Sequence, residues 1–216
     1  MIWTTGQRAS AGAWQRLQLW SAVVDNPKPP PQFWAQASCS PAGLDVRFRL
    51  IWTPADATVM VPQQNARDSS GPERRDGLWQ HTCFEVFAGL VGSDSYWEIN
   101  LSPSGDWNVY RFSGYRSGQA PELAYGQLPL TVIGPRAAPP VADCRLGAPR
   151  ALLELELCCP LPPPLHQWLQ SGTAPALELG LSAVLEGREG ELSYWALQHP
   201  GSEPDFHDRR GWLLRL

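Results

Sequence analysis

Polar side chains stand inside apolar runs of the segment 76–112, where their burial would need a chemical reason. Glu85 lies in the middle of the apolar run 83–87, and Glu98 and Asn100 alternate with apolar residues over 95–101. Because successive strand residues point to opposite faces, Glu98 and Asn100 share one face. A buried carboxylate is costly unless it meets a partner or a ligand. The pattern therefore predicts a polar groove built on neighbouring strands.

The pairing register of these strands decides what the carboxylates contact. If Glu85 stands opposite Glu98, the like charges raise one pKa or require a cation or ligand hydroxyls between them. If Glu98 instead stands opposite Arg111, the two form an ordinary ion pair between strands. Asn100 has an equally simple alternative role, which is to satisfy the turn at Ser102-Pro103. A shift of one residue separates these interpretations.

The 11 tryptophans offer flat rings of the kind that suit sugars. A ring face carries a negative quadrupole that attracts the C–H groups of a pyranose, and the indole N–H donates hydrogen bonds. Trp79, Trp107 and Trp195 are the candidate platforms, and the alternative is that they are core residues, since large aromatic residues dominate sandwich cores. Three further tryptophans are assigned to the core: Trp52, Trp97 and Trp212.

A Pro-rich loop at 199–208 gathers imidazole and carboxylate groups, which are ligands of divalent metals. Its spacing matches no zinc or calcium motif, so side chains that cap turns are the alternative, and we expect no metal site. The main candidate ligand-binding residues are Trp79, Glu85, Glu98, Asn100, Trp107, Arg111 and Trp195. A second set of candidates consists of His81, Tyr110, His199, Asp205 and His207.

Charge and composition exclude several classes of protein. The net charge is −4 and the basic residues are scattered, which argues against nucleic acid as a partner. No segment approaches the roughly 20 apolar residues of a membrane span, and the N-terminus lacks the pattern of a signal peptide. Five cysteines without metal or redox spacing are typical of reduced thiols. We therefore expect a cytoplasmic protein with no membrane partner.

Signatures of common enzymes are absent from the sequence. It contains no Gly-x-Ser-x-Gly, no Gly-x-x-x-x-Gly-Lys, no Gly-x-Gly-x-x-Gly and no His-Glu-x-x-His. We accordingly name no catalytic residue and expect no cofactor. A pair such as Glu85 and Glu98 nevertheless has the chemistry of glycoside hydrolysis, which uses two carboxyl groups.

Period-two alternation is the dominant structural signal of the chain. Strands are expected at 44–50, 83–89, 95–101, 107–112, 151–157, 177–186, 191–198 and 211–216. Only 163–170 has the proline and glycine punctuation of a short helix, and 62–76 and 134–141 have the composition of exposed loops. The pattern predicts one all-β domain over 1–216, a two-sheet antiparallel β-sandwich with about nine or ten strands.

Four motifs of the sequence form a recognisable set: Leu78-Trp79-Gln80-His81-Thr82-Cys83-Phe84-Glu85, Tyr96-Trp97-Glu98-Ile99-Asn100-Leu101-Ser102-Pro103-Ser104-Gly105-Asp106-Trp107, Tyr194-Trp195-Ala196-Leu197 and Pro204-Asp205-Phe206-His207. They resemble those of bacterial DOMON-like proteins, a group related to family 9 carbohydrate-binding modules and to a domain associated with UDP-N-acetylenolpyruvoylglucosamine reductase-like proteins. The resemblance covers about 40–216. It implies an immunoglobulin-like or jelly-roll sandwich with a groove for sugars or, in other branches, for haem.

The resemblance leaves the ligand open. Sugar-binding relatives carry an aspartate just before the strand that bears the glutamate, whereas Thr82-Cys83 occupies that place here, so no calcium ligand carries over. Haem-binding relatives use a methionine and a histidine, and Met60 is the one methionine beyond the first residue. We expect a non-catalytic domain that binds a small carbohydrate. The alternatives are a haem module and a carbohydrate-active enzyme that uses paired carboxylates.

Overall fold

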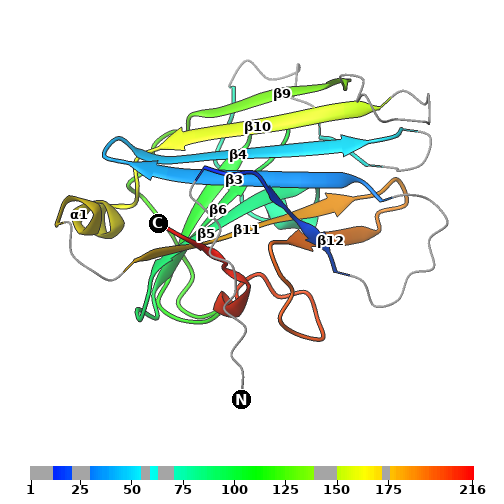
Figure 1. Ribbon diagram of the computed structural model, residues 1–216. Helices are drawn as coiled ribbons and strands as arrows, with labels where there is room; N and C mark the ends of the chain where they lie inside the picture. Colours follow the sequence, from blue (N-terminus) through cyan, green and yellow to red (C-terminus); the bar gives the residue numbers. More distant parts are fainter. Residues whose placement is uncertain (1–11, 21–29, 55–58, 63–70, 139–149, 172–175) are drawn as a thin grey trace.

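Two antiparallel sheets face each other in the computed structural model, which describes residues 12–20, 30–54, 59–62, 71–138, 150–171 and 176–216 (Figure 1). One sheet has the order β1 (Gln15–Arg16), β3 (Gln32–Ser40), β4 (Gly43–Trp52), β10 (Ala151–Cys159) and β9 (Leu130–Ala137). The other has the order β2 (Gln18–Leu19), β12 (Leu192–Ala196), β11 (Leu177–Glu186), β5 (Cys83–Leu90), β6 (Tyr96–Leu101), β7 (Trp107–Phe112) and β8 (Ala120–Pro121), with β13 (Leu214–Arg215) beside β11. The chain therefore folds as the predicted β-sandwich.

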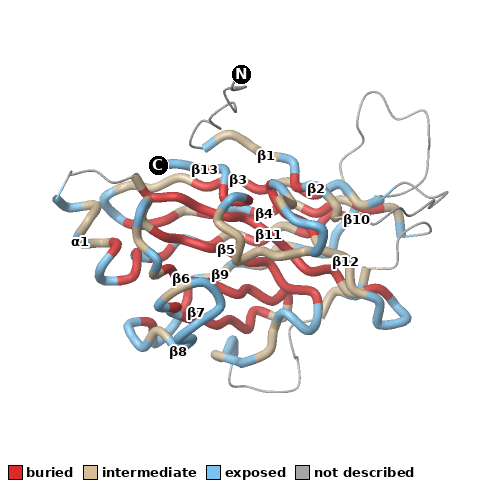
Figure 2. The backbone as a smooth tube through the Cα atoms, turned by 90° about the horizontal axis from the view of Figure 1, so that it is seen from below, coloured by how far each residue is buried: buried red, intermediate tan, exposed pale blue. Residues whose placement is uncertain are grey.

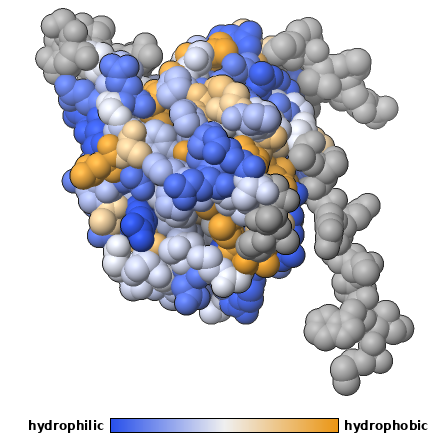
Figure 3. All heavy atoms as spheres, turned by 90° about the vertical axis from the view of Figure 1, so that its left-hand side faces the viewer, coloured by the Kyte–Doolittle hydropathy of each residue, from blue (hydrophilic) through white to orange (hydrophobic). Residues whose placement is uncertain are grey.

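Three short helical segments complete the described elements: η1 (Leu78–Gln80), α1 (Pro163–Ser171) and η2 (Arg209–Gly211). The helix expected at 163–170 is thus confirmed. Within the described ranges, no helix is long and apolar enough to cross a membrane. On the side of the molecule that Figure 3 shows, hydrophobic residues form small groups among polar ones.

Most strands follow the predicted alternation, and the exceptions have a local cause. The expectation of an exposed loop at 134–141 is wrong for 134–137, which end the edge strand β9. Gly134 and Pro135 stand where the pairing of β9 with β10 is irregular, and an edge strand tolerates a proline at such a point. The remaining residues 139–141 lie outside the described part of the chain.

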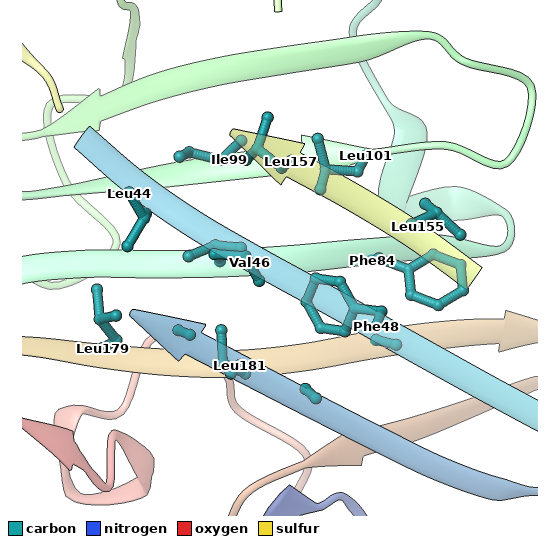
Figure 4. Close-up of a cluster of buried hydrophobic side chains, with 14 of the residues drawn as sticks. Leu44, Val46, Phe48, Phe84, Ile99, Leu101, Leu155, Leu157, Leu179 and Leu181 are labelled. Atoms are coloured by element: carbon teal, nitrogen blue, oxygen red, sulfur yellow. The ribbon is translucent and has the colours of Figure 1, made fainter. Parts of the chain in front are cut away.

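The core between the sheets is made by the inward-facing residues of this alternation. Figure 4 shows Phe48 of β4 and Phe84 of β5 at its centre, and their ring centroids are 5.4 Å apart. Phe33 of β3 meets the Phe84 ring edge-on at 5.2 Å, and Leu17 is also buried in the cluster. The packed core therefore includes residues before position 40, where the range of the motif resemblance begins.

The eight-stranded sheet is buried on its outer face as well as on its inner face. Phe87, Tyr96, Tyr110, Phe112 and Trp212 form a second buried cluster there. Trp212 was assigned to the core and is indeed buried, but it belongs to this outer cluster and packs so closely that a Cβ on Gly180 would lie 2.5 Å from its ring. As a result β5, β6 and β11 are buried along most of their length (Figure 2).

Arg74 joins the segment before β5 to the eight-stranded sheet. The composition of 62–76 predicts an exposed loop, but Arg74 is half-buried, with its guanidinium carbon 4.4 Å from the Trp107 ring centroid. The guanidinium donates hydrogen bonds to Asn108 Oδ1 at 2.8 Å and to the carbonyl oxygens of Glu122 at 3.0 Å and Tyr125 at 2.7 Å. One side chain thus satisfies acceptors from β7 and from the segment that follows β8.

We expect Arg74→Ala to lower the free energy of unfolding by about 2–4 kcal/mol, because partly buried acceptors lose their donor. Urea unfolding measures this change. Arg47→Ala is the matched control, since the Arg47 side chain is 54% exposed and lies 3.7 Å from Glu156, and its loss should cost less than about 1 kcal/mol. Equal losses in the two variants would contradict the anchoring role of Arg74.

Candidate functional site

A cleft with a volume of about 450 Å³ opens on the outer face of the eight-stranded sheet. Its apolar walls include the rings of Trp79, Phe112, Tyr194 and Phe206. Its polar lining consists of Gln80, Glu85, Glu98, Arg116, Gln119 and His207. The floor comes from the central strands, whereas Trp79 and Gln80 come from η1 and the remaining polar walls come from the segments 113–119 and 197–208. The cleft thus joins a hydrogen-bonded floor to walls made by loops.

The two carboxylates share the cleft face, but neither predicted pairing is present. Glu85 stands opposite Asn100 and not opposite Glu98. Glu98 stands opposite Tyr110, one position away from Arg111. Glu85 and Glu98 are therefore diagonal neighbours on adjacent strands, and they are only 3% and 5% exposed. Arg111 is exposed, alternates with Tyr110 along β7 and does not line the cleft, so its predicted place in the site is wrong.

Polar contacts from Asn100 and His207 surround the Glu98 carboxyl group. Asn100 Nδ2 donates to Glu98 Oε1 at 2.7 Å, and His207 Nε2 lies 3.7 Å from Glu98 Oε2. The Tyr96 hydroxyl is 2.7 Å from His207 Nδ1 and accepts a hydrogen bond from the Arg116 backbone N–H at 3.2 Å. When the Tyr96 hydroxyl donates to Nδ1, the imidazole proton lies on Nε2 and faces Glu98.

Burial shifts the pKa values of the floor residues in the direction that favours their neutral forms. It raises the pKa of Glu98 to about 7, although Asn100 and Arg116 both favour the charged form. Burial and the neighbouring Glu98 charge raise the pKa of Glu85 well above its usual value. Burial, assisted by Arg116, lowers the pKa of His207 to about 4, so the imidazole is neutral near pH 7. The carboxyl pair therefore retains a proton under conditions in which exposed glutamates are ionised.

Arg116 is a cleft residue that the sequence reading missed. It has a φ of 49°, a left-handed conformation that residues other than glycine rarely adopt. Its Nη2 donates to Asp205 Oδ1 at 2.8 Å, and the Tyr115 hydroxyl bonds the other oxygen of that carboxylate. The segment 113–118 has the composition of an ordinary turn, and nothing in its pattern relates it to a loop 90 residues later. Asp205 thus holds Arg116 in place.

Of the three predicted tryptophan platforms, the structure brings only Trp79 to the cleft. Trp79 is 37% exposed, and its ring meets Tyr110 edge-on at 5.8 Å. Trp107 and Trp195 are 2% and 3% exposed and lie in the core between the sheets, so the expectation that they face the ligand is wrong. The reason is strand alternation, since the residue adjacent to Trp195 is Tyr194, and Tyr194 lines the cleft.

The second set of candidates is only partly assembled at the cleft. His207 lines it, whereas Tyr110 is buried beside it and donates to Asp76 Oδ1 at 2.8 Å. His81 lies outside the cleft, 2.9 Å from Glu186. His199 also lies outside it, with Nε2 2.9 Å from the Gln18 carbonyl oxygen.

The described residues do not assemble a metal or haem site at the cleft. They contain no group of three or more His, Cys, Asp or Glu side chains placed to hold a metal ion. Met60, the methionine of the haem hypothesis, is 46% exposed and does not line the cleft. Met60 and His207 therefore do not form an axial pair across it.

The raised pKa of Glu98 predicts a pH dependence of stability. The folded state binds a proton more tightly than the unfolded state, so wild-type stability should fall as pH rises from about 4.5 to about 7. Glu98→Gln cannot ionise and should lack this loss. Its free energy of unfolding should exceed that of the wild type by up to about 3 kcal/mol at pH 8, and the difference should vanish near pH 4. Urea unfolding at several pH values measures both effects.

Glu154→Gln is the matched control on the five-stranded sheet. Although partial burial acts in the opposite direction, hydrogen bonds from Arg136 and Arg49 hold the pKa of Glu154 below its usual value. Its stabilisation is present above the ordinary pKa, so this variant should be less stable than the wild type at pH 8. If both variants shift stability in the same direction, the proton held by Glu98 is not the cause.

Comparisons with known proteins support the fold. No family model matches the sequence, and no curated protein matches it. Among solved structures, a protein from Bacteroides uniformis ATCC 8492 described as a "putative carbohydrate-binding protein" aligns with a TM-score of 0.57 and 13% sequence identity. The alignment covers 94% of this chain and 86% of the other. At this identity the similarity establishes a shared β-sandwich architecture, and membership of the DOMON-like group stays a prediction.

Proposed function

We propose that this chain is a non-catalytic carbohydrate-binding domain whose cleft holds a small sugar or a similar polyol. The observation that carries this proposal is the composition of the cleft, which places buried hydrogen-bonding groups on the floor and aromatic rings on the walls. A pyranose presents the matching surfaces, which are an apolar face of C–H groups and a rim of hydroxyl groups. The volume of about 450 Å³ falls in the usual range for small-molecule sites.

The protonation state of the carboxyl groups on the cleft floor also suits a polyol. A protonated Glu85 donates one hydrogen bond and accepts others, while Glu98 is held by Asn100 and keeps acceptor capacity toward the cleft. Gln80 and Gln119 add amide groups that both donate and accept. Sugar hydroxyl groups have the same dual character, so such a lining can satisfy them without a net charge on the ligand.

One sequence resemblance and one structural comparison are consistent with this proposal. The sequence motifs resemble those of DOMON-like proteins related to carbohydrate-binding modules, and the structural neighbour carries a carbohydrate-binding description.

From composition, we also propose a single cytoplasmic domain that binds neither nucleic acid nor membranes. The four cysteines in the described ranges, Cys39, Cys83, Cys158 and Cys159, are free thiols.

Titration of tryptophan fluorescence with a panel of mono- and disaccharides tests the proposed function. We expect a saturable change with at least one sugar and, in Trp79→Ala, about tenfold weaker binding, because a stacked ring contributes about 1 kcal/mol or more. Trp34→Ala is the control, since this tryptophan lies on the five-stranded sheet, away from the cleft. The proposal fails if no sugar gives saturation, or if the two variants weaken binding equally.

A second candidate function is supported by the pKa of Glu98 alone. A carboxyl group with a pKa of about 7 is suited to general acid catalysis at neutral pH, and Glu85 stands nearby as a second carboxyl group. Hydrolysis of aryl glycosides should then be measurable and should fall at least about a hundredfold in Glu98→Gln. No turnover on a broad glycoside panel would remove this candidate.

A further inference from the structure

Carboxyl groups outnumber cationic groups in the lining of the cleft, within the part of the chain that the structure describes. Glu85 and Glu98 bring two carboxyl groups, and Arg116 is the one lysine or arginine among the lining residues. The Arg116 guanidinium is already bonded to Asp205, with Nη2 and Oδ1 2.8 Å apart. His207 is neutral near pH 7 and so adds no positive charge to the cleft.

Glu85 is the more exceptional of the two carboxyl groups. It is 97% buried, it lines the cleft, and no described cationic side chain forms an ion pair with it. Glu98 has the His207 imidazole 3.7 Å away, which offers a neutral N–H. Buried carboxylates are normally paired, so this floor has unused capacity for a positive group.

The cleft walls also suit a positive group. Trp79, Tyr194 and Phe206 line the cleft, and the faces of aromatic rings attract cations. An ammonium group has three N–H donors, which two carboxyl groups and ordered water can satisfy. A calcium ion needs six to eight oxygen ligands, more than these two glutamates offer, and the described residues hold no cluster of three metal-binding side chains here.

We infer that the ligand of the cleft is an amino sugar, whose protonated amine lies against Glu85 and Glu98 while its ring lies along the aromatic wall. This inference rests on the proposed carbohydrate function and narrows its ligand class. The positive charge of the amine would take the place of the proton that the carboxyl pair retains. Gln80 and Gln119 would then bond the ring hydroxyl groups, as they would for a neutral sugar.

Matched pairs of sugars test the inference on the wild-type protein. Glucose and glucosamine, galactose and galactosamine, and mannose and mannosamine differ only in one hydroxyl or ammonium group, and N-acetylglucosamine has the nitrogen without the charge. Calorimetry near pH 7 should show at least about tenfold tighter binding of one amino sugar than of its neutral partner. N-acetylglucosamine should bind no more tightly than glucose.

The outcomes separate the inference from the proposed function. If neutral sugars bind and the amino sugars bind equally or more weakly, the amine inference is wrong and the carbohydrate function stands. If no sugar in the panel or among disaccharides binds, the carbohydrate function itself is wrong, and the inference falls with it.

Isosteric variants locate the amine. In Glu85→Gln and Glu98→Gln the hydrogen-bonding shape is kept but the charge is lost, so the ratio of amino-sugar affinity to neutral-sugar affinity should fall to about threefold or less. Glu186→Gln is the control, because Glu186 ends β11 outside the cleft lining, beside His81. If Glu186→Gln reduces the preference as much as the floor variants do, the amine does not lie at this floor.

Discussion

The burial of β5, β6 and β11 on both faces is the constraint on which the rest of the molecule depends. The inner face packs against the five-stranded sheet, and the outer face is covered by the second aromatic cluster and the C-terminal segment. A polar side chain on that outer face is therefore removed from water whether or not a ligand is present. Glu85 and Glu98 occupy such positions, and their shifted pKa values follow from this one arrangement.

The loops over the outer face and the strands that form the cleft floor are coupled through polar contacts as well as through packing. The Tyr96 hydroxyl meets both the Arg116 backbone and the His207 ring, so one floor residue orients two segments that are far apart in the sequence. Asp205 ties these segments together a second time by holding Arg116. Because each loop is fixed by the sheet and by the other loop, the walls of the cleft are preorganised for a ligand.

The sequence predicts the sandwich well because alternation is a local property of each strand. The same reasoning places Glu98 and Asn100 on one face of their strand, as in the structure, where Asn100 stands opposite Glu85 of the neighbouring strand. This reasoning fails where the position of a side chain depends on the pairing register of two strands or on the segments that cover the outer face of the sheet. Trp107 and Trp195 have side chains suited to sugars but point to the inner face of the sheet. Arg116 is held at the site by contacts with Asp205 and Tyr96, which are distant in the sequence.

The close approach of Trp212 to Gly180 has a consequence for how this cleft could change. Glycine at this position lets the C-terminal segment lie directly on the sheet, and Trp212 Nε1 donates to the Phe206 carbonyl oxygen at 2.9 Å. The wall that carries Phe206 and His207 is thus anchored at a point separate from the floor. Substitutions in 199–204, before Asp205, can then alter the shape of the opening while the anchor and the sandwich stay intact. A lineage of such proteins would be free to diversify in ligand choice by varying one loop.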